Sequence, residues 1–176
     1  MRPSDVVIRS ARDDDLRAIT RIYAHHVRYG LATFETEPPT QEEMARRHSE
    51  LASKGFPYLV AVRDHEVLGY AYAGPYRARP AYRFVVENSI YLDPIYARQG
   101  IGRILLDALI GAAETRGFRQ MIAIIGDSAN HASVKVHERC GFTLVGTFRS
   151  VGFKHGRWVD TVLMQRALGE GDQTLP

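Results

Sequence analysis

Residues 93–115 read DPIYARQGIGRILLDALIGAAET, and this stretch predicts a strand end, a glycine-containing loop and a helix in direct succession. Asp93-Pro94 terminates the preceding β-rich segment, because proline lacks the N–H group that a central strand needs. Apolar residues then recur at helical spacing over Ile104–Thr115, and Gly117 ends that helix. Small residues before the helix let backbone N–H groups approach an anion closely, so the stretch indicates a phosphate-binding turn.

The turn itself is Gln99-Gly100-Ile101-Gly102-Arg103, and its glycines fit more than one kind of strand-to-helix connection. A tight turn that binds nothing explains them equally well. The dinucleotide-binding motif of a Rossmann fold does not fit, because Leu105 stands where a third glycine is needed and the turn lies at mid-chain. The P-loop pattern of nucleotide-binding proteins is absent from the sequence. Arg98 and Arg103 are the side chains that would add positive charge beside an anion.

Outward from this turn, hydrophobic periodicity predicts an alternation of strands and helices. Thr40-Gln-Glu-Glu43 has the spacing of a capping box, which marks a helix start. Met121–Ile125 is a nearly uniform apolar run, typical of a strand covered on both faces. We expect a right-handed crossover through Ile104–Thr115 to make this strand the parallel neighbour of Phe84–Leu92. The expected strands are 6–9, 58–62, 67–73, 84–92, 121–125, 142–153 and 157–166, and the expected helices are 13–30, 40–55, 104–115 and 130–139.

Length and composition favour one domain, and the order of the expected strands and helices predicts an α/β fold with a mixed sheet. The chain has 176 residues, of which 45% are hydrophobic and 24% charged, as in ordinary soluble globular proteins. We assign residues 1–168 to the domain and residues 169–176 to a polar, frayed C-terminal tail. The single cysteine, Cys140, excludes an internal disulfide and fits a reducing, cytoplasmic compartment. The N-terminus lacks the apolar segment of a signal peptide, and no apolar run has the roughly 20 residues that span a bilayer.

The charge pattern bears on possible partners. The net charge is +3 and the pI about 9.1, but the basic residues are scattered and form no stripe with interleaved aromatic residues. We therefore expect neither nucleic acid nor a membrane as a partner. A modest positive balance suits a polyanionic small ligand if positive groups converge on its phosphates. The histidines show no metal-ligand spacing, so no metal is expected.

The chain resembles the GNAT superfamily of N-acetyltransferases, first in the succession of strand, Gln99–Gly102 turn, helix and strand. Further segments are similar to the branch that acetylates phosphinothricin and methionine sulfoximine. The resemblance implies a single GNAT-like domain whose mixed, mostly antiparallel sheet has a central splayed parallel strand pair and flanking helices. It implies transfer of the acetyl group of acetyl-CoA to the amine of a small amino-acid-like substrate, of the phosphinothricin, methionine sulfoximine or methionine sulfone type. The segments are Phe34–Pro38, Tyr70–Arg79, Val86–Tyr91, Ser133–Glu138 and Gly152–Trp158.

Cofactor residues follow from the same resemblance. In the family, the turn and the helix start bind the pyrophosphate of acetyl-CoA, and a strand backbone pairs with the pantetheine arm and polarises the acetyl carbonyl. The usual Gln or Arg that opens the family pattern is Ala97 in this chain, which has no polar side chain to contribute there. Asn130 resembles a cofactor-contacting position but is nearly as well explained as an N-cap. The expected cofactor residues are Ile90, Tyr91, Leu92, Arg98, Gln99, Gly100, Ile101, Gly102, Arg103, Asn130 and Ser133.

Glu87 and His137 are the expected catalytic residues. Strand alternation places Glu87, Ser89 and Tyr91 on one face, and a carboxylate on a central strand is costly unless it is paired or faces a cleft. Glu87 therefore either forms a structural ion pair or accepts the proton of the amine. The resembled branch has histidine at position 137 where the wider family has tyrosine, which makes His137 a candidate proton acceptor or acid. Cys140 has no clear base nearby in the sequence and is interpreted as structural.

Substrate contacts are expected from two loops. Arg77 and Arg79 precede the Glu87 strand, and guanidinium groups match carboxylate and phosphinate geometry, although a solvated basic loop explains them equally well. Phe34 and Glu35 are expected to form the opposite wall. The segment around Trp158 serves packing or a homodimer contact.

Two other functions fit parts of the pattern. A non-catalytic acyl-CoA-binding sensor would keep the glycine turn but would not need Glu87 or His137. A protein N-terminal acetyltransferase would need an open peptide groove, whereas the arginine-bearing loop indicates a closed pocket for a small acid.

Overall fold

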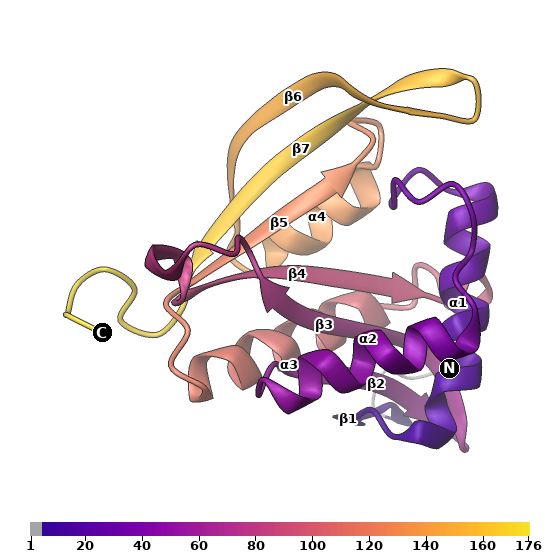
Figure 1. Cartoon of the computed structure of the whole chain (residues 1–176), viewed down its shortest axis with the longest axis horizontal. Coiled ribbons are helices and arrows are strands. Elements are labelled where there is room, and N and C mark those ends of the chain that lie inside the picture. The colour runs from indigo at the N-terminus through magenta and orange to yellow at the C-terminus, as the bar shows by residue number, and fades with distance from the viewer. Residues whose placement is uncertain (1–4) are drawn as a thin grey trace.

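The computed structural model describes residues 5–176, and its elements follow the predicted order (Figure 1). Thr40 accepts a hydrogen bond from the backbone N–H of Glu43, as the capping-box spacing predicted. The strands are β1 (Val7–Ser10), β2 (Tyr58–Arg63), β3 (Glu66–Pro75), β4 (Val85–Leu92), β5 (Gln120–Gly126), β6 (Thr143–Lys154) and β7 (Arg157–Ala167). The helices are α1 (Leu16–Tyr29), α2 (Gln41–Ser53), α3 (Ile101–Thr115) and α4 (His131–Arg139), with short 3-10 turns at Asp13–Asp15, Pro80–Tyr82 and Pro94–Tyr96.

Within the described residues the strands form a seven-stranded sheet in the order β1-β2-β3-β4-β5-β7-β6. Neighbouring strands are antiparallel except β4 and β5, which are parallel and are joined through α3. A parallel pair requires a crossover of this kind, so the predicted pairing of these two strands is confirmed. The α/β class and the mixed, mostly antiparallel sheet are confirmed with it.

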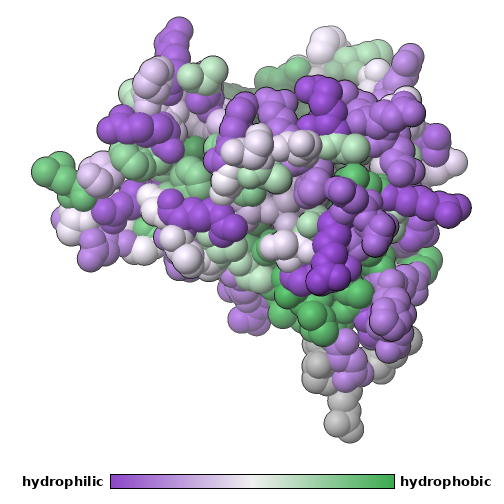
Figure 2. All heavy atoms as spheres, turned by 60° about the horizontal axis from the view of Figure 1, so that its bottom comes forward, coloured by the Kyte–Doolittle hydropathy of each residue, from purple (hydrophilic) through white to green (hydrophobic). Residues whose placement is uncertain are grey.

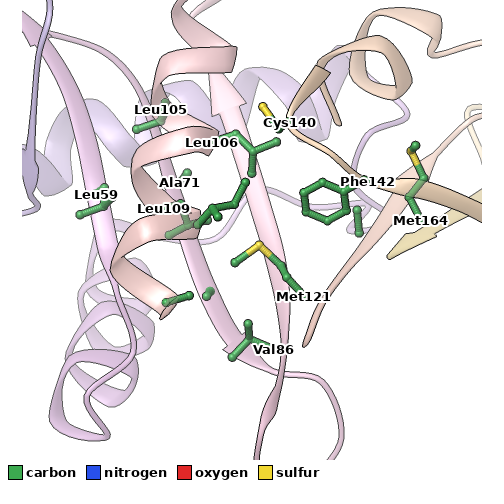
Figure 3. Close-up of a cluster of buried hydrophobic side chains, with 14 of the residues drawn as sticks. Leu59, Ala71, Val86, Leu105, Leu106, Leu109, Met121, Cys140, Phe142 and Met164 are labelled. Carbon is green, nitrogen blue, oxygen red and sulfur yellow. The ribbon is translucent and has the colours of Figure 1, made fainter. Parts of the chain in front are cut away.

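The two faces of the sheet carry different cores. Val86 on β4 and Met121 on β5 belong to a cluster with α3, which Figure 3 shows as leucines of the helix pointing at the strands. Tyr91 on β4 belongs to the cluster on the other face, where α1 and α2 pack. Because side chains alternate along a strand, even-numbered residues of β4 face α3 and odd-numbered ones face α1 and α2.

The parallel pair separates partway along its length. The register between β4 and β5 ends at Asn88 opposite Ala123, whereas β4 continues to Leu92 and β5 to Gly126. Figure 1 shows the two strands diverging toward their carboxyl ends. Ile124 is 37% exposed, so the prediction that β5 is covered on both faces is wrong. Met121, Ala123 and Ile125 on one face of β5 belong to the α3 core, whereas Ile122 and Ile124 on the other face belong to neither core cluster.

Two predicted boundaries need correction. Helix α3 begins at Ile101, not at Ile104, because Gly100 adopts a left-handed conformation with φ of 81° and acts as the N-cap. The tail from residue 169 onward is not frayed along its length, since the Arg119 guanidinium donates hydrogen bonds to Thr174 Oγ1 and to the Leu175 carbonyl. Hydrophilic side chains predominate on the face shown in Figure 2, and hydrophobic residues form separate patches there. Among residues 5–176 no helix is long and apolar enough to cross a membrane.

Candidate active site

A narrow slot lies where β4 and β5 separate. It has a volume of about 40 Å³, and both strands contribute residues to its walls. Beyond Asn88 the edge of β4 that faces β5 has no strand partner, because their register ends there. Unpaired backbone groups at such an edge can accept an extended ligand as an added strand. The predicted cofactor residues Ile90, Tyr91, Asn130 and Ser133 and the predicted catalytic residue His137 all line this slot.

The glycine turn forms the start of α3. Arg98 and Gly100 both have positive φ, at 62° and 81°, so the backbone curls before the helix begins. No described residue accepts a hydrogen bond from the backbone N–H groups of Gln99, Gly100, Ile101 or Gly102, which are left for solvent or a ligand. Successive free N–H groups at a helix N-terminus form a favourable anion site.

The two arginines beside the turn differ in how free their charges are to interact with an anion. Arg98 is exposed and has no ion-pair partner among the described residues. The Arg103 guanidinium lies 3.6 Å from the Asp107 carboxylate one helical turn away, and this ion pair partly neutralises its positive charge. Gly102 is buried, and a Cβ atom there would come within 3.5 Å of Leu92, an ordinary contact distance. Leu92 thus packs against the helix start, which brings the end of β4 to the turn.

Glu87 is half-buried on the face of β4 that packs toward α1 and α2. Burial raises the pKa of its carboxyl group, and no described residue forms an ion pair with it. The predicted alternative of a structural ion pair therefore finds no partner in residues 5–176. A carboxylate with a raised pKa is a stronger base than an ordinary glutamate, so it is suited to accept a proton.

His137 lies on the opposite face of the sheet and is 2% exposed. Its Nδ1 is 2.8 Å from the Ser133 carbonyl oxygen, and its Nε2 is 3.1 Å from the Asn88 side chain. The Asn88 atom beside Nε2 is Oδ1, so both ring nitrogens lie beside oxygen acceptors. Burial lowers the pKa of His137, and the neutral ring that this favours donates only one of the two hydrogen bonds. The Asn88 amide also donates to the Ile122 carbonyl at 3.1 Å, so it connects His137 to β5. Sequence reasoning missed Asn88, whose signal is a polar residue facing inward on a central strand.

No described contact joins Glu87 and His137. Asn88, which touches His137, and Glu87 are consecutive on β4 and therefore point to opposite faces. The structure thus does not bring the two predicted catalytic residues together on one face, and only His137 lines the slot.

Asn130 and Ser133 sit at the start of α4. The Asn130 side chain accepts a hydrogen bond from the Ser133 N–H at 3.2 Å and caps the helix. The N-cap interpretation is therefore confirmed, and it is compatible with a cofactor contact because both residues also line the slot.

The loop after α1 closes over the end of the slot. Phe34 lies against Gly152, where a Cβ atom would come within 2.1 Å of the Phe34 ring, so only glycine fits. The buried Lys154 ammonium donates to the Thr33 carbonyl at 2.7 Å and holds the same loop to β6. Glu35 accepts hydrogen bonds from the Tyr23 hydroxyl and the Arg47 guanidinium, so its carboxylate is already engaged.

Arg77 and Arg79 are exposed in the loop between β3 and β4. The Arg77 guanidinium stacks over Tyr76 at 5.2 Å, whereas Arg79 forms no ion pair with a described residue. This loop adjoins the start of β4, and the slot opens toward its end. Along β4, the two arginines are therefore closer to Glu87 than to the slot. Neither arginine contacts Glu87 or a residue that lines the slot. In the described part of the chain, no group of at least 3 His, Cys, Asp or Glu side chains is arranged to hold a metal ion.

Comparison with known proteins agrees with this geometry. Residues 8–163 match the family model for the acetyltransferase (GNAT) domain. A phosphinothricin N-acetyltransferase of Alcaligenes faecalis is 56% identical over 96% of this chain and 86% of its own length. An L-methionine sulfoximine/L-methionine sulfone acetyltransferase of Salmonella typhimurium is 36% identical over 94% of this chain and 96% of its own length.

Among solved structures, a GNAT superfamily phosphinothricin acetyltransferase from Sinorhizobium meliloti, crystallised in complex with acetyl-CoA, superposes with a TM-score of 0.95. The two sequences are 49% identical, and the match covers 98% of this chain and 93% of that one. The predicted likeness to the GNAT superfamily is confirmed. The diverging parallel strands, the free N–H groups before α3 and the family match over most of the chain lead to one conclusion: the chain belongs to the GNAT superfamily of acetyltransferases.

Proposed function

We propose that this protein transfers the acetyl group of acetyl-CoA directly to the α-amino group of a small amino acid of the phosphinothricin or methionine sulfone type. The observation that carries the proposal is the slot between β4 and β5, whose walls include the edge of β4 that has no strand partner after Asn88. The relatives named above act on such amino acids, which supports this acceptor class.

The chain's own residues fit acetyl-CoA in two places. The free N–H groups of Gln99–Gly102 suit the pyrophosphate, with Arg98 adding charge. The unpaired edge of β4 beyond Asn88 suits the amide-bearing pantetheine arm as an added strand. A backbone N–H of this edge would hydrogen-bond the thioester carbonyl and favour the oxyanion that develops during attack.

The reaction needs a neutral amine. In the proposed step, Glu87 accepts one proton from the ammonium group, and the nitrogen lone pair then attacks the thioester carbon. The C–S bond breaks, the nitrogen releases its second proton, and the departing thiolate takes up this proton to leave as CoA, so that the acetyl group stays on nitrogen as an amide. Desolvation raises the pKa of Glu87, which brings the carboxylate closer in basicity to the amine. His137 holds Asn88 and the wall of the slot in this scheme.

Cys140 does not fit a covalent route. Its thiol is buried, and burial raises its pKa to about 12, so it is protonated at neutral pH and a poor nucleophile. The sulfur faces the Arg103 carbonyl inside the core beside α3, away from the β4 edge. A structural role, as interpreted from the sequence, agrees with this environment.

We expect Arg79→Ala to raise the KM for an amino-acid acceptor by about ten- to a hundredfold, because a charge-assisted hydrogen bond to the acid group is lost. Arg79 is exposed and unpaired among the described residues, so its removal should not alter folding. Initial-rate kinetics with the acid and with the matching plain amine measure the effect. Arg83→Ala is the control, since Arg83 lies in the same loop but stacks on Phe84. Equal losses for acid and plain amine would mean that Arg79 acts on the loop and not on the substrate.

A thiol-release assay with acetyl-CoA tests the function as a whole. We expect CoA release with phosphinothricin and methionine sulfone, and little with a peptide that offers an N-terminal amine. Fast release with the peptide alone would favour a protein N-terminal acetyltransferase. Binding of acetyl-CoA without release by any amine would favour a sensor.

We also propose that a second copy of the chain covers the hairpin of β6 and β7. β6 is an edge strand of the sheet, and an exposed apolar edge is an aggregation hazard unless a partner covers it. Figure 1 shows the hairpin arching away from the rest of the molecule. Light scattering, which reports the mass in solution, distinguishes a dimer from a monomer. The exposed apolar side chains of the hairpin are Leu144, Val145, Phe148, Val151, Phe153 and Trp158.

A further inference from the structure

Lys154 is a buried charge that the proposed reaction does not use. It is the last residue of β6 and is 3% exposed, although lysine side chains are almost never fully buried unless they are paired. No described carboxylate forms an ion pair with it, and Glu35 attracts it only from a longer distance. Its ammonium group donates instead to the Thr33 carbonyl, at 2.7 Å. Burial of a charge on one neutral acceptor costs free energy, which points to a role other than stability.

The segment that Lys154 holds carries a wall of the slot. Thr33 follows Ala32, which lines the slot between β4 and β5. The backbone of this segment lies directly on Gly126, the last residue of β5, because a Cβ atom there would collide with the Leu31 carbonyl oxygen. Displacement of Thr33 would therefore carry Ala32 away from the slot.

The tip of the β6–β7 hairpin holds this loop from one face of β6. Side chains alternate along a strand, so Gly152 and Lys154 point toward the loop, whereas Phe153 points away from it and is 60% exposed. The Phe34 ring fills the space that a side chain at position 152 would occupy. Figure 1 shows the loop after α1 below the hairpin tip. The tip thus contacts two consecutive loop residues, Thr33 and Phe34.

The other side of the loop is fixed by α1 and α2. The Thr33 hydroxyl lies 2.9 Å from the Tyr23 hydroxyl, which also bonds Glu35, and Arg47 donates to the same carboxylate. These contacts hold the loop to the helices, and the Lys154 bond holds it to β6. Loss of the Lys154 bond leaves the helix side intact, so the loop should loosen without unfolding of the protein.

We propose that Lys154 is a positioning residue, whose ammonium group holds the Thr33 backbone so that Ala32 stays in the wall of the slot. A binding site that is populated only part of the time has a proportionally lower apparent affinity, and a fixed wall avoids this loss. The inference rests on the proposed function, in which the slot receives the pantetheine arm of acetyl-CoA. Lys154 itself contacts no reacting group in this scheme.

Lys154→Met tests this role, because it removes the ammonium group and keeps most of the length of the side chain. We expect it to weaken acetyl-CoA about three- to tenfold, because the loosened loop leaves the slot wall part of the time. At saturating substrates kcat should stay within about twofold, because bound ligand returns the loop to its place. Lys54→Met is the control, since Lys54 is exposed at the end of α2 and pairs with Glu50. Calorimetry measures the affinity, and initial rates separate KM from kcat.

Hydrogen exchange of the ligand-free protein measures the loop directly and needs no reaction. In Lys154→Met the amides of residues 31–36 should exchange faster than in the wild type, while those of α3 stay unchanged. Gly152→Ala loosens the same loop through a different contact, because the new Cβ atom displaces the Phe34 ring. It should therefore give the same exchange pattern and also weaken acetyl-CoA.

These measurements distinguish the inference from the proposed function. If the wild type acetylates no amino acid, the proposed function fails, and faster loop exchange with weaker acetyl-CoA binding in the variants still supports the role of Lys154. Loop exchange in Lys154→Met as slow as in the wild type would overturn it. A lower kcat with unchanged acetyl-CoA affinity would also overturn it, because Lys154 would then act on the reaction and not on the wall.

Discussion

Glu87→Gln is expected to lower kcat by about 10²–10⁴-fold, the usual contribution of a general base, while acetyl-CoA affinity stays near wild type. The amide cannot accept the amine proton, but it keeps the size of the side chain. The half-buried Glu87 has no ion-pair partner in the described chain, so the substitution breaks no salt bridge. Steady-state kinetics together with calorimetric titration of acetyl-CoA measure the two quantities.

The pH dependence gives a second test of Glu87. Because burial raises its pKa, wild-type activity should rise with pH through a range above that of an ordinary glutamate, as the carboxylate forms. In Glu87→Gln the remaining activity should follow the fraction of free amine in solution. An unchanged kcat and an unchanged pH profile in this variant would show that another group takes the proton.

Thermal unfolding of Glu87→Gln tests whether this variant is folded. The folded protein holds the Glu87 proton more tightly than the unfolded chain does, so this group favours the folded state at low pH. That contribution is lost as the pH rises from the unfolded pKa through the raised folded pKa. At neutral pH the desolvated carboxylate is a cost, so Glu87→Gln should have a Tm equal to or above that of the wild type.

Gly100→Asp is expected to weaken acetyl-CoA binding by about tenfold or more, because it adds a negative charge beside the proposed pyrophosphate site. A Cβ atom on Gly100 meets nothing within 4 Å, so the effect is not steric. Aspartate and asparagine tolerate the left-handed backbone of this residue, where φ is 81°, better than other side chains do. Isothermal titration with acetyl-CoA measures the affinity.

Gly100→Asn is the matched control for this charge. It has nearly the same shape and the same backbone tolerance, so it should bind acetyl-CoA close to the wild-type affinity. High salt should reduce the difference in acetyl-CoA affinity between the two variants, because salt screens the repulsion between exposed charges. Equal affinities at low salt would mean that the pyrophosphate does not lie at this turn.

The fold was predictable where local pattern decides it. The Thr40–Glu43 cap, the β2–β3 hairpin and the crossover through α3 follow from capping, periodicity and the handedness of parallel connections. The exposure of Ile124 was not predictable from its own segment. It depends on which elements pack against each face of β5, and the face that carries Ile122 and Ile124 belongs to neither core cluster.

The site was predictable residue by residue but not as an arrangement. Alternation placed Glu87 on a face of its strand, and helical spacing placed His137 on a face of its helix. Neither pattern says which face of the sheet a helix covers, so the separation of the two side chains by the sheet emerged only in three dimensions. Tyr70 reads as an ordinary core residue in the sequence, because the missing hydrogen-bond partner of its hydroxyl has no sequence signal.

The most direct test of the account is to identify the product of a reaction of the wild-type protein with labelled acetyl-CoA and methionine sulfone. Mass spectrometry of the mixture follows the label, and thiol titration counts the CoA that is released. The account predicts one N-acetylated amino acid for each CoA released and no label on the protein at any time. Label that appears on the protein before the amino acid, or CoA release without an acetylated amine, would contradict direct transfer to the acceptor.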